Sequence, residues 1–239
     1  MLFLLEYHKL LGRTFERFSE RYNGPGGWME RLGETDDARL LWYFELPMTV
    51  GESYLVGTLT AVRDGAAWQR LSDRVRSGDL KSWAEGTDVL RHWSSGQMMD
   101  PLSWSPLQGI DLESVPTSPQ DHGGVRIYLM EHVRPYPGML NEYITRNGEV
   151  YAPTLTTENN RNWWLRYRAI FQNALGSGHR LRELTLMQEI VDNQGLIDYL
   201  SNPAPAEQYA PGRWSRIALD IRDEWQSYLL QRVAWSPLP

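Results

Sequence analysis

The stretch Trp104-Ser105-Pro106-Leu107 decides how this chain is interpreted, because the same four residues return as Trp235-Ser236-Pro237-Leu238. The two copies lie 131 positions apart, and Trp83 and Trp214 are separated by the same interval. Matched residues at a fixed offset are typical of an internal repeat. The sequence therefore predicts a domain that occurs twice.

Other residues correspond between the halves at similar offsets. Trp93 corresponds to Trp225 at an offset of 132, and Leu4-Leu5-Glu6 corresponds to Leu129-Met130-Glu131. We interpret the repeated tryptophans mainly as core and inter-repeat packing residues, since large rings bury much apolar surface.

The repeat divides the chain into two units of ordinary domain size. We expect one domain at residues 1–108 and a second at 125–239, joined by a linker at 109–124. The linker region is rich in Pro, Ser, Thr, Asp and Gly and lacks periodicity, which is typical of either an ordered crossing or a flexible tether.

Hydrophobic periodicity predicts the same order of elements in each half. In the first half we expect strands at 2–10, 39–46, 53–62 and 98–104, helices at 14–22, 66–75 and 80–90, and a loop at 23–27. In the second half we expect strands at 125–134, 162–171, 179–189 and 228–235, and helices at 139–146, 196–200 and 214–225.

The order strand, helix, strand, strand, helix, strand is the ferredoxin-like pattern. Such a domain covers only one face of its antiparallel sheet with helices, so the other apolar face needs a partner. Two copies meet this need by packing sheet on sheet. We therefore predict an α+β fold in which tandem ferredoxin-like repeats form an intramolecular dimeric α+β barrel around a central space.

Composition narrows the classes of partner. The net charge of −6 disfavours a nucleic-acid backbone, which needs a concentrated basic face. The absence of cysteine excludes disulfides and thiolate chemistry. There is neither a signal-peptide pattern nor an apolar run of membrane-spanning length, so we expect a cytoplasmic protein without a membrane partner. Eleven Trp and twelve Tyr suit a pocket for a small apolar or aromatic molecule.

The first strands of the two halves carry the main candidate chemistry. Tyr7 and His132 occupy matching positions there, as do Lys9 and Arg134, on a face too polar for helix packing. We expect this face to line the central space, where a His beside a Tyr and a cation can move a proton and stabilise an enolate or phenolate. The alternative is a structural, hydrogen-bonded His at a strand end.

The opposite, more aliphatic face of these strands carries Glu6, His8 and Glu131. A buried carboxylate has a raised pKa and can act as a base, so Glu131 and His8 are further catalytic candidates. The favoured alternative for both glutamates is pairing with a neighbouring arginine.

Part of the sequence resembles NIPSNAP-type domains of the dimeric α+β barrel superfamily. The similar residues are Tyr128 to His132 followed by Pro137-Gly138, and Tyr54 to Val62 followed by Trp68 and Trp83. The first half departs from this pattern because it has Leu11-Gly12 in place of the Pro-Gly turn. The resemblance implies small, often aromatic substrates, and enzymes that include cofactor-independent oxygenases, isomerases and haem proteins.

Four residues are candidates for substrate binding. Trp164 and Arg168 share one face of a strand, where an indole and a guanidinium could hold an aromatic or anionic ligand. His179 begins a strand at the expected mouth of the central space, and Tyr128 belongs to the resembling motif. Salt bridging at a sheet edge is the alternative for Arg168.

The motifs of the common cofactor enzymes are missing from the sequence. It contains no HExxH, GxSxG, phosphate-binding loop or dinucleotide fingerprint. We expect acid/base chemistry without an organic cofactor or metal: an isomerase, cyclase, lyase or cofactor-independent oxygenase. The alternatives are a haem enzyme, since one His suffices as axial ligand, and a non-catalytic carrier or assembly protein. The chain could form a homo-oligomer under each of these functions.

Overall fold

Eight strands and the helices between them make up the computed structural model, which describes residues 1–239 except 47–51, 157–163, 175–181 and 203–205. The first half contains β1 (Leu2–Leu10), α1 (Phe15–Asn23), α2 (Trp28–Gly33), β2 (Ala38–Glu45), β3 (Leu55–Val62), α3 (Gly65–Arg76), α4 (Lys81–Asp88) and β4 (Arg91–Pro101). The linker contains η1 (Leu112–Ser114). The second half contains β5 (Arg126–Pro135), α5 (Leu140–Arg146), η2 (Asn147–Tyr151), α6 (Ala152–Thr156), β6 (Leu165–Asn173), β7 (Leu184–Ile190), α7 (Asn193–Ser201), η3 (Ala206–Tyr209), α8 (Trp214–Ile221) and β8 (Arg222–Arg232).

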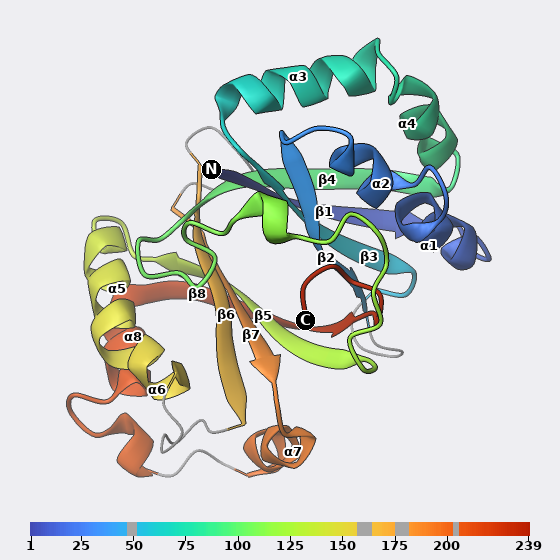
Figure 1. The fold of residues 1–239 in the computed structure, drawn as a ribbon. Coiled ribbons are helices and arrows are strands. Elements are labelled where there is room, and N and C mark those ends of the chain that lie inside the picture. Colours follow the sequence, from blue (N-terminus) through green and yellow to red (C-terminus); the bar gives the residue numbers. More distant parts are fainter. Residues whose placement is uncertain (47–51, 157–163, 175–181, 203–205) are drawn as a thin grey trace.

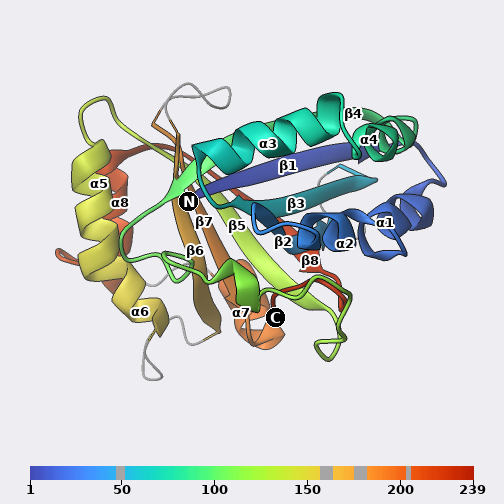
Figure 2. The same ribbon diagram turned by 45° about the horizontal axis from the view of Figure 1, so that its top comes forward.

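The strands form one closed barrel in the order β1-β3-β2-β8-β5-β7-β6-β4. Each half contributes an antiparallel sheet of four strands, and the two sheets join where β2 pairs with β8 and β4 pairs with β6. The helices lie outside the barrel, with α1 to α4 on one side and α5, α6 and α8 on the other (Figures 1 and 2). This arrangement confirms the predicted α+β fold with two ferredoxin-like sheets.

Local sequence explains the regular elements. Strand β1 has the predicted bounds, and its alternating side chains separate Phe3 and Leu5 inside the barrel from His8 and Leu10 beneath the helices. The predicted N-cap of the third helix, Asp64, accepts a hydrogen bond from the backbone N–H of Ala67.

The first Trp-Ser-Pro-Leu copy fastens the first half to the second. Ser105 Oγ accepts a hydrogen bond from the backbone N–H of Ile170 in β6 at 3.1 Å, and the N–H of Leu102 donates to the carbonyl of Ile170. The Trp104 ring lies 5.8 Å from the Tyr167 ring and packs against the helix-layer core of the second half.

The second copy repeats these contacts in the opposite direction. Ser236 Oγ accepts from the backbone N–H of Tyr43 in β2 at 3.0 Å, and the N–H of Val233 donates to the carbonyl of Tyr43. The Trp235 ring lies 4.7 Å from the Tyr43 ring, in the helix-layer core of the first half. The inter-repeat packing predicted for these two tryptophans is therefore confirmed.

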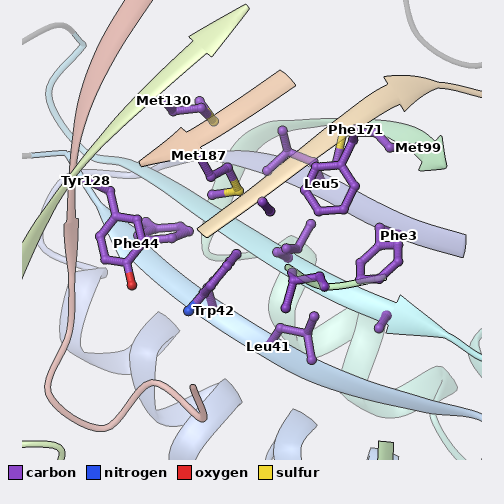
Figure 3. Packing of buried hydrophobic residues seen from close by; sticks show 14 of the residues in the cluster. Phe3, Leu5, Leu41, Trp42, Phe44, Met99, Tyr128, Met130, Phe171 and Met187 are labelled. Carbon is purple, nitrogen blue, oxygen red and sulfur yellow. The ribbon is translucent and has the colours of Figure 1, made fainter. Parts of the chain in front are cut away.

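Side chains from all eight strands meet inside the barrel as one hydrophobic core. Aromatic rings occupy much of it, as in the pair Phe3 and Phe171 at 4.9 Å and the pair Phe44 and Tyr128 at 5.2 Å (Figure 3). The two segments that follow the Trp-Ser-Pro copies extend this core through Leu107 and Leu238.

The linker is an ordered crossing. Its 3₁₀ turn η1 begins after Asp111, whose carboxylate accepts from the N–H of Glu113, and Leu112 and Val115 are buried in the barrel core. The linker and the C-terminal segment therefore cover the barrel end at which β1 and β5 begin. Tyr128 Oη, near the start of β5, donates to the carbonyl oxygen of Pro239 at 3.2 Å.

Three expectations about the last quarter of each repeat were wrong: where the closing strands begin, the equivalence of Trp93 and Trp225, and the core position of these two tryptophans. The closing strands β4 and β8 begin earlier than predicted, so the helical stripe stops at Ile221 and Trp225 lies in β8. Trp93 and Trp225 are not equivalent either, because Trp93 pairs with Lys9 whereas Trp225 pairs with Val133. A one-residue offset in a strand places the two side chains on opposite faces. Both are more than two-fifths exposed, so they are not core residues.

The first half also contains a helix that periodicity did not predict. Helix α2 follows the expected loop directly, and its six residues are too few to show a helical repeat. Trp28 and Met29 of α2 are buried against the sheet, and the Trp28 ring stacks on Trp83 at 4.4 Å.

Replacing Ser236 tests the contribution of the Trp-Ser-Pro contacts. We expect Ser236→Ala to lower the free energy of unfolding by about 1–3 kcal/mol, because it leaves the buried Tyr43 N–H without an acceptor. Ser105→Ala should act similarly at Ile170. Urea denaturation followed by tryptophan fluorescence measures both, and the exposed Ser114→Ala is the control, with an expected change of about 0.5 kcal/mol or less. Equal changes in the free energy of unfolding for all three substitutions would contradict a stabilising role of the Ser105 and Ser236 hydrogen bonds.

Candidate functional site

A tyrosine and a histidine meet inside the barrel at the end where β1 and β5 finish. Tyr7 Oη and His132 Nε2 are 3.0 Å apart, and Tyr7 Oη also lies 3.3 Å from the sulfur of Met130. The Tyr228 ring stands edge-on to the His132 ring at 5.8 Å. The structure thus brings together the two residues that the sequence placed at matching positions.

A buried carboxylate stands on the other side of the imidazole. Glu183 Oε1 lies 3.4 Å from His132 Nδ1, and the side chains of both residues are about one-tenth exposed. Glu183 Oε2 accepts from Arg134 Nε at 3.2 Å, and Arg134 reaches outward to Glu224 at 2.7 Å. Arg134 therefore holds the carboxylate against the ring.

Thr185 and Gln97 complete the network. Thr185 Oγ1 lies 3.1 Å from His132 Nδ1, and Gln97 Nε2 donates to the same oxygen at 3.3 Å. A hydroxyl oxygen accepts two hydrogen bonds, so it can receive both donors. This network and the charge of Glu183 assign the imidazole proton to Nδ1. Nε2 is then the acceptor that faces Tyr7.

Burial keeps both partners of the pair neutral. Desolvation raises the pKa of Tyr7 far above its usual value, and the nearby Tyr228 and Glu183 raise it further. Desolvation lowers the pKa of His132, and the charge of Glu183 opposes that shift in part. At neutral pH the site therefore presents a neutral imidazole base beside a phenol that donates a hydrogen bond.

The pair lies on the approximate two-fold axis that relates the halves. Tyr7 faces Gly57 across β1 and β3, and His132 faces Thr185 across β5 and β7 in the same register. A contact between equivalent positions places the axis between them. The site is therefore built from residues of both halves, and the residues on its first-half side differ from those on its second-half side.

His8 lies on the other face of β1, beneath the helices. Arg91 Nη1 is 2.7 Å from its Nδ1, while Tyr22 Oη and Thr58 Oγ1 lie 3.2 and 3.3 Å from its Nε2. Desolvation, followed by the charge of Arg91, lowers the pKa of His8 to about 3. The structure separates His8 from Tyr7 and His132 by the sheet.

Glu131 is also beneath the helices, but in the second half. Its Oε1 accepts from Trp225 Nε1 at 3.0 Å, and Arg222 stacks over the Trp225 ring at 4.7 Å. Burial raises the pKa of Glu131, and Trp225, Arg222, Gln188 and Ser227 moderate the rise. Glu6 behaves alike: burial raises its pKa and Arg91 opposes the shift. An arginine charge therefore acts on each glutamate, and the predicted pairing with arginine stays a prediction.

Three of the four predicted substrate-binding residues lie away from this site. Tyr128 lies inside the barrel at the end that the linker covers, and Arg168 forms an ion pair with the buried Glu189. Trp164 packs against Tyr199 in the helix layer of the second half. His179 lies outside the described residues.

Sequence reasoning missed Glu183, Thr185 and Gln97. Glu183 directly precedes β7 and Thr185 lies within it, in a segment that was predicted only as a strand. The one available signal was their spacing of two, which puts both side chains on one face. Gln97 fell before the predicted start of its strand.

The buried histidines that the structure describes are engaged in hydrogen bonds. Both ring nitrogens of His132 and of His8 already have hydrogen-bond partners. An axial ligand needs one nitrogen free for iron. No step proposed below therefore goes through haem. Within the described ranges, no three His, Asp or Glu side chains gather as a metal site, and no helix is long and apolar enough to cross a membrane.

Replacing His8 tests its buried, neutral state. Its folded pKa of about 3 lies below the usual value near 6.5. His8 therefore stabilises the folded state above pH ~6.5, and this contribution is lost as the pH falls toward 3, with a slope of up to about 1.4 kcal/mol per pH unit. We expect His8→Gln to reduce the acid dependence of urea unfolding over this range. The exposed His92→Gln should leave that dependence unchanged, and equal slopes for both variants would contradict the prediction.

Replacing Glu183 tests the electrostatics of the pair. We expect Glu183→Gln to lower the pKa of His132 further, because the substitution removes the charge that favours the imidazolium. The pH titration of the His132 Cε1 proton by NMR measures this shift. Glu224→Gln, which alters the outer partner of Arg134, is the control and should shift the titration less.

Comparison with known proteins shows likeness in structure only. No protein family model matches the chain, and no curated protein matches it in sequence. A protein named "putative monooxygenase" from Lactobacillus acidophilus NCFM has a TM-score of 0.57 at 8% identity, covering 97% of this chain and 93% of that one. An anthrone oxidase-like protein has a TM-score of 0.56 at 11% identity, covering 97% and 91%.

The similar structures also include a protein with a different name. Chlorite dismutase from Candidatus Nitrospira defluvii has a TM-score of 0.53 at 8% identity, covering 97% of this chain and 90% of that one. These structures are similar to this chain over nearly its full length, which agrees with its closed barrel of eight strands. The chain has the dimeric α+β barrel fold, closed within a single polypeptide.

Proposed function

We propose that this protein is a small-molecule enzyme that moves a proton at the Tyr7–His132 pair. The observation that carries the proposal is the contact of 3.0 Å between Tyr7 Oη and His132 Nε2, with Glu183 next to Nδ1. A neutral imidazole that a carboxylate orients is a general base, and a neutral phenol is a hydrogen-bond donor for a developing oxyanion.

The pair suits a substrate with a weakly acidic C–H or O–H group beside an oxygen. His132 Nε2 removes that proton, and Tyr7 donates its hydrogen bond to the substrate oxygen that gains negative charge. Glu183 stabilises the imidazolium that forms. The side chains next to the pair, including Phe44, Met130 and Tyr228, favour an apolar or aromatic substrate.

Oxygenation is the reaction that the names of two similar structures suggest, a putative monooxygenase and an anthrone oxidase-like protein. We propose that it proceeds here without a cofactor. An electron-rich carbanion reacts with dioxygen directly. In the overall change a CH₂ group and O₂ give a carbonyl group and water, so the carbon is oxidised by four electrons and dioxygen is reduced by four. An isomerisation uses the same first step and returns the proton to another atom.

Oxidation of anthrone in air tests the proposal. Absorbance of the quinone product and uptake of dioxygen measure turnover, with 1-naphthol as a second substrate. We expect His132→Gln to lower kcat about 10²- to 10⁴-fold, the usual contribution of a general base, and Tyr7→Phe to lower it by less.

The matched control is His92→Gln, which removes an exposed imidazole and should retain wild-type turnover. Turnover by His132→Gln at the wild-type rate would contradict the proposed base. Saturable binding of both compounds without any chemical change would favour a carrier instead.

A further inference from the structure

Gln97 connects the two halves next to the junction of β4 and β6. In the described residues, β4 pairs with β6 from Met99 to Pro101. Gln97 lies two residues before Met99, so both side chains are on the inner face of β4. The Nε2 of Gln97 donates to Thr185 Oγ1 in β7 at 3.3 Å, across the intervening strand β6. A first-half side chain is therefore hydrogen-bonded to the second-half surroundings of the site.

The equivalent position in the second half carries a different group. Gln97 faces Leu5 across β1 and β4, and Tyr228 faces Met130 across β5 and β8. Leu5 and Met130 are equivalent, because each lies two residues before the residue that its strand contributes to the site. Tyr228 places its ring edge-on to the His132 ring at 5.8 Å. The second half therefore packs a ring at this position, whereas the first half supplies a hydrogen-bond donor.

The orientation of the Gln97 amide follows from its two neighbours. Its Nε2 also donates to the sulfur of Met99 at 3.6 Å, and a thioether sulfur can only accept. The two N–H groups of the amide therefore have separate acceptors, Met99 on the same strand and Thr185 on β7. This arrangement assigns the nitrogen, and not the oxygen, to the side that faces Thr185.

The Thr185 side chain can turn either its hydroxyl or its methyl group toward His132, since both branch from one Cβ atom. Thr185 is completely buried, where the loss of a hydrogen bond is costly. Its Oγ1 lies 3.1 Å from His132 Nδ1 and accepts from Gln97 as well. Rotation about the Cα–Cβ bond would break both contacts together. Gln97 therefore favours the rotamer that keeps the hydroxyl against the imidazole.

We propose that Gln97 is a positioning residue for the proton transfer: its hydrogen bond fixes the Thr185 hydroxyl against His132 Nδ1, which keeps Nε2 directed at Tyr7. The inference rests on the proposed function and adds a residue that does not touch the reacting atoms. The first half then acts on both ring nitrogens, on Nε2 through Tyr7 and on Nδ1 through Gln97. Orientation of the base therefore depends on docking of the two halves at the β4–β6 junction.

NMR of the full chain with ¹⁵N-labelled histidine tests this proposal without any substrate. The ¹⁵N chemical shifts of the His132 ring show which nitrogen carries the proton. We expect Gln97→Met, which keeps the length of the side chain and removes the amide, to move the two shifts toward each other. In the Thr185→Val background the same substitution should have no further effect, because the oxygen through which Gln97 acts is gone.

Turnover of anthrone gives the second measurement. We expect Gln97→Met to lower kcat about 2- to 10-fold, the size of one neutral hydrogen bond, with little change in KM. Gln97→Glu should retain most of the turnover, because a carboxyl group can bond the Thr185 hydroxyl in either protonation state. Gln97→Leu replaces Gln97→Met should that variant fail to fold, as thermal unfolding shows.

Gln231→Met is the matched control. Gln231 is a half-buried strand glutamine at the other junction, where it pairs with Glu45, and it lies on the outer face of β8. We expect this variant to retain the wild-type His132 shifts and the wild-type kcat.

The outcomes separate this inference from the proposed function. Unchanged His132 shifts in Gln97→Met, or a change that is equally large in the Thr185→Val background, would overturn the positioning role. Shifts that depend on Gln97 through Thr185, without turnover by the wild type, would keep the positioning of His132 and refute the enzyme. Turnover that depends on His132 but not on Gln97 would keep the enzyme and overturn this inference.

Discussion

Burial of the inner faces of two sheets is the constraint on which this structure depends. Each half covers only the outer face of its sheet with helices, so the strand residues that point inward have no partner within their own half. Closing both sheets into one barrel removes that exposed surface and also removes the free sheet edges. The reciprocal contacts of Ser105 with Ile170 and of Ser236 with Tyr43 hold this arrangement at both junctions.

The same closure creates the candidate site. A residue next to the approximate two-fold axis meets its counterpart in the other half, so two equivalent positions become neighbours. Here the two members differ, as Tyr7 and His132, and a donor faces a base. The second half has Thr185 where the first half has Gly57, and Glu183 where the first half has Leu55, so the symmetric frame holds an asymmetric site. The domain boundaries at 108 and 125 stay predictions within this scheme.

Burial acts differently on the two faces of the first strands. Inside the barrel it keeps Tyr7 and His132 neutral in positions where they contact each other. Beneath the helices it acts on His8 and Glu131, whose ring nitrogens and carboxylate are held by arginine, tyrosine, threonine or tryptophan side chains. A strongly shifted pKa therefore does not mark a reacting group by itself, and the neighbours of each group decide its role.

The sequence by itself determined the repeated order of elements, the barrel and the face on which Tyr7 and His132 lie. The reason is that strand periodicity and a fixed offset are local properties of the chain. It also identified Trp104 and Trp235 as packing residues between the repeats.

Only the tertiary structure decided which residues surround the pair. Glu183 and Thr185 contact His132, and Gln97 contacts Thr185, from segments far away in the chain. Strand register, which depends on pairing and bulges, sets these distances. The one-residue difference between Trp93 and Trp225 shows the limit clearly. The spacing of two residues in the sequence does not show whether they pair in the same strand register. A shift of the register by one residue nevertheless moves a side chain from one face of the sheet to the other.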